Sequence, residues 1–89
     1  MKVIVTVIAK DRVGIIADVC ALLAAHGVNI LDISQTILQD YFTMIMLADV
    51  SGCDLPFSEL TRTLHEAGEN LGLDIRAQRE DIFNAMHRI

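Results

Sequence analysis

The residues best suited to bind a small charged molecule lie in two short segments, Asp11–Ile15 and Asn29–Ile30. The carboxylate of Asp11 could pair with an ammonium group, and the side-chain amide of Asn29 both donates and accepts hydrogen bonds. Gly14 has no Cβ, so a ligand or a neighbouring strand could approach its backbone closely. Amide hydrogens at a helix start, with the positive end of the helix dipole, could hold a carboxylate. Together these groups suit a zwitterion.

Each of these residues also has a purely structural interpretation, which the sequence leaves open. Asp11 could cap the helix that is expected from about Arg12. Gly14 could simply ease the packing of that helix on a strand. Asn29 could be no more than the turn residue that leads into the next strand.

The elements that position these segments begin with a β-branched run. This run predicts a strand over Lys2–Ile8, apolar on both faces and therefore central and covered on both sides. Apolar residues at helical spacing then predict a helix over about Arg12–His26, and Gly27 provides its left-handed stop. The segment Asn29–Gln39 predicts an edge strand with one face toward a core, because Leu31, Ile33 and Ile37 alternate with Asp32, Ser34 and Thr36.

The second half of the chain predicts a strand, a helix and a strand. Tyr41–Leu47 is apolar on both faces, so we place it beside the first strand, and a tight turn without glycine precedes it. Pro56 introduces a helix that Gly72 ends, and Leu73–Gln78 alternates as a strand. Residues 81–89 predict a short helical tail.

The resulting β-α-β-β-α-β order predicts an α+β, ferredoxin-like domain over residues 1–89, with both helices on one face of a four-stranded antiparallel sheet. The other face would expose an apolar patch of several hundred Å² in a monomer. We expect the C-terminal tail and a second subunit to cover it, so the chain is expected to be a homodimer.

Composition excludes several classes of function. The chain has 89 residues, 53% of them hydrophobic, and a net charge of −5 with 7 basic residues that are scattered. This disfavours direct binding of nucleic acid or of an anionic membrane. The apolar runs are too short for a membrane span, and the N-terminus does not resemble a signal peptide, so a cytoplasmic protein is expected. Cys20 and Cys53 are expected to be free thiols.

Catalytic and metal-binding patterns are not evident in the sequence. His26, His65 and His87 lie on different predicted elements without the spacing of metal ligands. No phosphate-binding loop, dinucleotide fingerprint or zinc motif is present. We therefore predict no catalytic residue, no metal and no cofactor.

The segments Lys10–Val19 and Gly27–Ile30 resemble the signature of the ACT domain family. Asp-Arg-x-Gly-Ile at the first turn is followed, at the family's spacing, by Gly-x-Asn-Ile. The resemblance covers the chain from Lys2 to about Arg79. Three further segments resemble more narrowly a group of stand-alone ACT proteins: Asp32–Gln35, Tyr41–Met44 and Ile82–Met86. That group is similar in turn to the ACT domains of the glycine-cleavage-system repressor and of formyltetrahydrofolate deformylase.

The resemblance implies a regulatory module that binds an amino acid or a similar small molecule at a subunit interface. In that pattern the ligand lies between the first strand-to-helix turn of one subunit and the second strand, often that of the neighbour. Serine-binding members have asparagine in place of Asp11 and proline in place of Val13, so serine is not the expected ligand. The implied contacts are Asp11, Arg12, Val13, Gly14 and Ile15 from the turn, with Asn29 and Ile30 from the strand.

The leading hypothesis is a non-enzymatic, cytoplasmic ligand-sensing homodimer that acts through another protein, such as a partner enzyme or regulator. One alternative is a protein-interaction or dimerisation module that regulates a partner without any small ligand. A second alternative, a small enzyme, is supported only by the similarity to part of a deformylase. A fold of this kind serves many purposes and does not decide between them.

Overall fold

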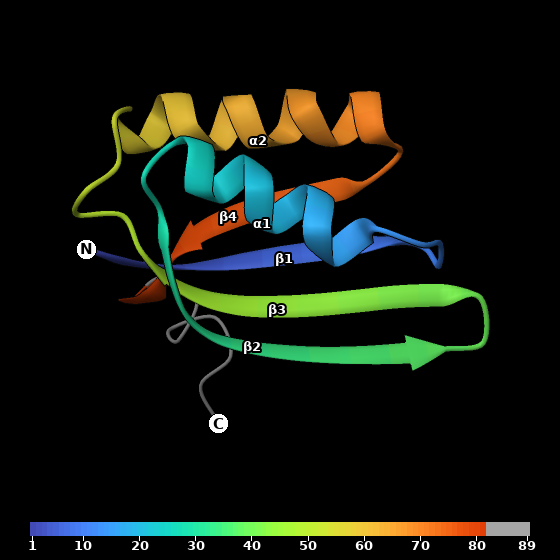
Figure 1. The fold of residues 1–89 in the computed structure, drawn as a ribbon. Coiled ribbons are helices and arrows are strands. Elements are labelled where there is room, and N and C mark those ends of the chain that lie inside the picture. The colour runs from blue at the N-terminus through green and yellow to red at the C-terminus, as the bar shows by residue number, and fades with distance from the viewer. Residues whose placement is uncertain (82–89) are drawn as a thin grey trace.

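A computed structural model of the chain describes residues 1–81. Its elements are β1 (Lys2–Lys10), α1 (Ile15–Ala25), β2 (Asn29–Leu38), β3 (Tyr41–Asp49), α2 (Phe57–Leu71) and β4 (Asp74–Arg79). The strands form one antiparallel sheet in the order β2-β3-β1-β4, and both helices lie on the same side of it (Figure 1). The predicted ferredoxin-like β-α-β-β-α-β fold is therefore confirmed. Of the predicted tail, residues 82–89 lie outside the described part of the chain.

The core lies between the sheet and the helices. Alternate residues of the two central strands point into it, and Val3, Val5 and Val7 of β1 are at most 1% exposed. Met44 and Met46 of β3 are fully buried beside them, so these methionines belong to the core. The predicted pairing of β1 with β3 is confirmed. The helices close the core with their buried residues: Ile15, Val19 and Leu23 of α1, and Leu60, Leu64 and Gly68 of α2.

The opposite side of the sheet has no covering layer among residues 1–81. We call this surface the open sheet face and define it by the outward residues of β1 and β3: Ile4, Thr6, Ile8, Thr43, Ile45 and Leu47. Ile8 is 46% exposed and Ile45 is 41% exposed. The prediction that β1 is covered on both sides is thus wrong for the described residues, because both helices pack on one face.

The prediction that one face of β2 meets a core is also wrong within the single chain. Leu31, Ile33 and Ile37 are 45%, 40% and 56% exposed. The strand forms an edge of the sheet, as expected, and a register shift between Ile30 and Asp32 interrupts its pairing with β3. Its helix-side residues flank the helical layer instead of lying beneath it. An exposed apolar edge strand is a surface on which another chain can pair.

The turn from α1 into β2 follows the expected pattern. Gly27 has φ +74°, and the amide of Val28 donates to the Leu23 carbonyl at 3.0 Å while that of Gly27 donates to Ala24 at 3.0 Å. These two bonds form a Schellman motif, which satisfies the last carbonyls of the helix. A Cβ on Gly27 would lie 2.5 Å from the carbonyl oxygen of Gly52. Only glycine therefore fits between the end of α1 and the β3–α2 loop.

Neither helix within residues 1–81 is long and apolar enough to cross a membrane. Cys20 and Cys53 are both free, as the sequence predicted, and both are half-buried.

Candidate functional site

The loop between β1 and α1 differs from the expectation at its helix start. The helix begins at Ile15, three residues later than expected, and Gly14 precedes it in the left-handed region with φ +90°. Asp11 does not cap the helix, so the structural role considered for it is wrong. Because the chain turns at Gly14, Asp11 remains at the end of β1, where its amide donates to the carbonyl of Asp40 at 2.6 Å.

The start of α1 carries amide hydrogens without a helical partner. The first helical bond runs from the amide of Asp18 to the carbonyl of Gly14 at 2.9 Å, so the amides of Ile15, Ile16 and Ala17 precede it. No side chain of the described residues caps this end. Such amides, together with the helix dipole, form a site for an anionic group.

A recess of about 240 Å³ opens beside this helix start. We call it the α1 recess. Its polar side chains are Asp11, Arg12 and Gln35, and its apolar wall includes Ile37 and Phe42. It combines unpaired amides, a carboxylate, a carboxamide and apolar surface in a volume suited to a small metabolite. The full lining comprises Asp11, Arg12, Gly14, Ile15, Ile16, Ala17, Gln35, Ile37 and Phe42.

Arg12 lines the recess, but its guanidinium already has partners in the chain. Nη2 donates to Asp18 Oδ2 at 3.0 Å and to the Leu71 carbonyl at 3.2 Å, and Nη1 donates to the Val13 carbonyl at 3.0 Å. Leu71 is the last residue of α2, where a cation also interacts favourably with the helix dipole. Arg12 therefore ties the β1–α1 loop to the far end of α2.

The predicted site residues divide into two groups. Asp11, Arg12, Gly14 and Ile15 meet at the recess, whereas Val13 is 98% exposed and does not line it. Asn29 and Ile30 lie at the opposite end of β2, where they pair with Asp49 and Ala48. At the rise of an extended strand, Asn29 is about 25 Å from Ile37. The turn and the start of β2, which the resemblance implies lie on either side of the ligand, are therefore far apart within one chain.

Sequence reasoning missed Gln35, Ile37 and Phe42. The hairpin of β2 and β3 returns beside the end of β1, and Phe42 pairs with both Ala9 and Ile37. The order of the elements could have indicated these residues. When a helix leads into a strand that runs back antiparallel to it, the start of the helix lies near the C-terminal end of the strand. Gln35 and Ile37 are the helix-side residues of that far end.

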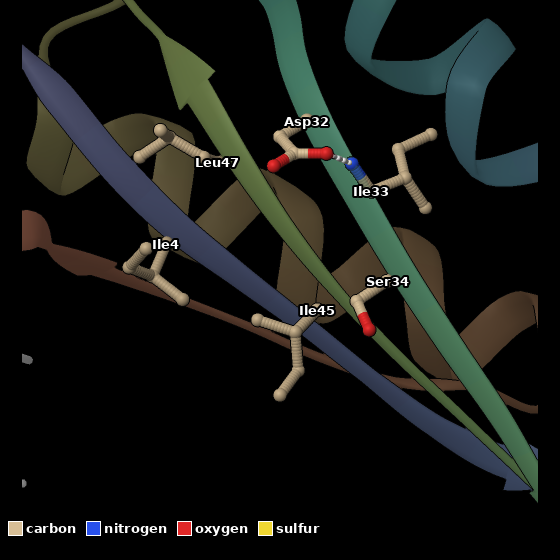
Figure 2. Close-up of a pocket in the computed structure, with 6 residues that line it drawn as sticks. All are labelled: Ile4, Asp32, Ile33, Ser34, Ile45 and Leu47. Carbon is tan, nitrogen blue, oxygen red and sulfur yellow. Dashed lines mark hydrogen bonds between the residues drawn. The ribbon is translucent and has the colours of Figure 1, made fainter.

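A second hollow of about 150 Å³ lies on the other side of the sheet. Figure 2 shows its residues from three adjacent strands: Ile4, Asp32, Ile33, Ser34, Ile45 and Leu47. The Asp32 carboxylate accepts the amide of Ile33 at 2.9 Å. This hollow is mainly apolar, and neither α1 nor α2 begins beside it, so it lacks the anion-binding character of the α1 recess.

Metal ligands do not cluster in the described residues. No group of three or more histidine, cysteine, aspartate or glutamate side chains there could hold an ion. His26 instead lies 3.0 Å from Asp54, with its Nδ1 facing Oδ1, and His65 lies 2.8 Å from Glu69 on α2. These pairs connect neighbouring parts of the surface.

Comparison with known proteins gives one consistent family. A family model described as an ACT domain matches residues 2–78. A UPF0237 protein of Clostridium acetobutylicum is 55% identical over 89 residues, which cover 100% of both chains. The solved structure of an ACT domain protein from Streptococcus pneumoniae is 42% identical, with a TM-score of 0.83 and 97% of each chain covered.

Two further structures match parts of longer chains. A formyltetrahydrofolate deformylase from Pseudomonas syringae pv. tomato superposes with a TM-score of 0.77 at 22% identity, over 88% of this chain and 27% of that one. A protein described as a glycine cleavage system transcriptional repressor superposes with a TM-score of 0.71 at 25% identity, over 86% of this chain and 44% of that one. The resemblance identified in the sequence is confirmed.

Proposed function

This chain belongs to the ACT domain family, and on that premise we propose that it is a regulatory module that binds an amino acid or a related small metabolite. The ligand would lie in the α1 recess at the interface of a homodimer. The module would be non-enzymatic and cytoplasmic, would need no cofactor, and would act through another protein.

The observation that carries this proposal is the uncapped start of α1 beside a carboxylate. A ligand carboxylate would accept hydrogen bonds from the amides of Ile15, Ile16 and Ala17. Its ammonium group would face Asp11, and Gln35 would donate or accept from the β2 side. A ligand side chain would then lie against Ile37 and Phe42. The charges of the recess thus complement those of a zwitterion.

A homodimer would reconcile the family's contacts with the geometry of one chain. The β2 edge beside the recess has unpaired backbone groups and exposed apolar side chains. If two chains met along these edges with antiparallel strands, the Asn29 end of one β2 would lie near the Leu38 end of the other. Asn29 and Ile30 of a second copy would then approach the recess that they cannot reach in their own chain.

The same exposed residues of β2 support the alternative of an interaction module without a ligand. Leu38 is 71% exposed and Ile37 is 56% exposed, which suits contact with another protein whether or not a ligand is bound. The two functions differ in one respect, because only a sensing module changes its stability or its partner affinity when a metabolite is added.

Calorimetric titration of the protein with the common amino acids and with reduced folates tests the proposal. We expect saturable binding of at least one compound. Asp11→Asn removes the negative charge that would face the ammonium group, and Gln35→Ala removes a hydrogen-bonding partner, so each should weaken binding about tenfold or more. Glu66→Gln, on the outer face of α2, is the matched control and should leave the affinity unchanged.

Two results would contradict the proposal. One is that no compound of the panel binds, while a partner protein is captured equally well with and without metabolites. The other is binding that Asp11→Asn and Gln35→Ala leave unchanged.

A further inference from the structure

The hydrogen bonds at the end of β1 determine which backbone groups of β3 face β2. In an antiparallel pair, opposite residues alternate between hydrogen-bonded and non-hydrogen-bonded pairs. The amide of Asp11, which follows β1, donates to the carbonyl of Asp40 at 2.6 Å, so these two residues form a bonded pair. The next pair along, Lys10 with Tyr41, is then a non-bonded one. The backbone groups of Tyr41 therefore point away from β1 and toward β2.

The same alternation identifies the backbone groups at the free edge of β2. Leu38 pairs with Tyr41, so Leu38 and every second residue before it, down to Asp32, bond to β3. The amides and carbonyls of the residues between them point outward from the sheet: Ile33, Gln35 and Ile37. A second strand that paired with this edge would bond to these three residues.

One of these outward amides already has an acceptor in its own chain. The amide of Ile33 donates to Oδ1 of Asp32 at 2.9 Å, as Figure 2 shows. The strand is irregular just before this contact, since its register shifts between Ile30 and Asp32. A charged side chain and an irregularity of this kind both hinder the pairing of an edge strand with another chain.

The two edges of the sheet are protected to different extents. The other edge strand, β4, carries several charged side chains, among which Arg76 and Asp74 form an ion pair at 3.2 Å and Arg79 adds a further charge. In β2, by contrast, Asp32 is the single charged residue of the strand. The protection of the β2 edge therefore depends chiefly on this one side chain.

The homodimer proposed above would need the Ile33 amide. For Asn29 of a second copy to lie beside Ile37 at the recess, the two-fold axis must pass midway between these residues, which is close to Ile33. An antiparallel pairing centred there uses the outward groups of Ile33 in both chains. The amide has one hydrogen, so a carbonyl of the second copy can accept it only after Asp32 releases it.

We propose that Asp32 is a guard residue that holds the β2 edge closed against a second copy of the chain. In the single chain its carboxylate occupies the Ile33 amide, and in the dimer a carbonyl of the second copy would take that place. Self-association is then weaker than the exposed apolar side chains of β2 would otherwise give, and it can respond to a ligand that stabilises the paired edge. This inference rests on the homodimer of the proposed function and adds what regulates it.

Sedimentation equilibrium of the ligand-free protein tests this role. Asp32→Ala removes the acceptor, and we expect the dissociation constant of the dimer to fall about tenfold or more, because a dimer contains two such bonds and each is equivalent to about a factor of five. Asp32→Asn removes the charge but keeps an oxygen that can accept the same bond, so its dissociation constant should lie between the two. Asp74→Ala makes the same substitution on β4 and, as the matched control, should leave the constant unchanged.

Hydrogen exchange of the Ile33 amide detects the bond itself. It is measured at a concentration at which the protein is monomeric, so it does not depend on any dimer. In Asp32→Ala this amide should exchange about fivefold faster, relative to an unstructured peptide of the same sequence. The amide of Gln35, on the same edge, should keep its rate.

The proposal is overturned if Asp32→Ala dimerises no more tightly than the unchanged protein, or if the Ile33 amide exchanges at the same rate in both. Equal dissociation constants for Asp32→Asn and Asp32→Ala would also overturn it, because the charge alone would then be responsible. If Asp32→Ala remains a monomer at every concentration, the homodimer through β2 is wrong as well. Calorimetry would still detect a metabolite bound at the α1 recess of a monomer, so failure of the guard and failure of the ligand site are distinguishable.

Discussion

Arg12 and Asp11 show how neighbouring residues of one loop take different roles. The Arg12 guanidinium is shared among Asp18, Leu71 and Val13, so it holds the loop to α2 and is not a free cation for a ligand. Asp11 has only its backbone amide engaged among the contacts described above, and its carboxylate lines the recess. Under the proposed function, a ligand ammonium group would therefore meet Asp11 and not Arg12.

Asp49 provides a prediction about pH. Hydrogen bonds from the Ser51 hydroxyl at 2.6 Å and the Ser51 amide at 2.9 Å lower the pKa of Asp49 below its ordinary value of 3.8. A lowered pKa contributes stability that is present above pH 3.8 and is lost as the pH falls through the folded-state pKa. Ser51→Ala should raise the pKa of Asp49 toward 3.8 without reaching it, because the backbone amide still donates.

An NMR titration of the Asp49 carboxyl carbon measures this effect. Ser58→Ala, which removes an exposed hydroxyl on α2, should leave the Asp49 pKa where it is. An Asp49 pKa that is the same in Ser51→Ala and in the unchanged protein would show that the hydroxyl bond does not form in solution.

At the scale of elements, the helices depend on glycine both for backbone conformation at their ends and for close packing. Gly14 and Gly72 have φ +90° and φ +74°, so their backbone conformation favours glycine. Gly68 lies inside α2, and a Cβ there would be 2.6 Å from the Leu73 carbonyl oxygen and 3.2 Å from Ile75 Cγ1. The absence of a side chain at Gly68 lets α2 pack closely on the returning strand β4.

We therefore expect Gly68→Ala to reverse the usual trend. Glycine-to-alanine changes within helices normally stabilise by about 1 kcal/mol, but overpacking against the Leu73 backbone should lower the free energy of unfolding by about 1–3 kcal/mol. Asn70→Ala adds alanine to the same turn at an exposed position and should change stability by a few tenths of a kcal/mol. Urea denaturation compares them. A Gly68→Ala protein as stable as the unchanged one would refute the close approach.

The elements themselves could be predicted from the sequence because local patterns determine them. The β-branched run predicted β1, and the apolar stripe predicted α2. The positions of Gly27 and Gly72 predicted where the two helices end. Two features could not be predicted in this way. The start of α1 depends on the left-handed conformation of Gly14, and the exposure of β2 depends on how far the helical layer extends over the sheet. Neither property is local in sequence.

At the scale of the whole molecule, the candidate site was predicted in part. The residues of the β1–α1 loop were identified by their chemistry and by the resemblance, and the structure brings Asp11, Arg12, Gly14 and Ile15 together. Asn29 and Ile30 were paired with them through a pattern that belongs to a dimer, whereas a single chain places Gln35, Ile37 and Phe42 there instead. A site shared between subunits cannot be assembled from the periodicity of one chain.

The apolar edge strand β2 gives the proposed function a consequence for the whole molecule. The β2 edge beside the recess would meet a second subunit. A homodimer formed through β2 would then bury Ile33 and Ile37, which are 40% and 56% exposed in the single chain. Ligand binding at that edge would be coupled to dimerisation, since both use the same strand.

The most direct test of the central claim is a ¹H–¹⁵N NMR titration of the protein with the amino acids and reduced folates. For a compound that binds, we predict shift changes concentrated at the amides of Ile15, Ile16 and Ala17, at the Gln35 side chain and, through the second subunit, at Asn29. Changes confined to other surfaces, or no change with any compound of the panel, would contradict a metabolite site at the α1 recess.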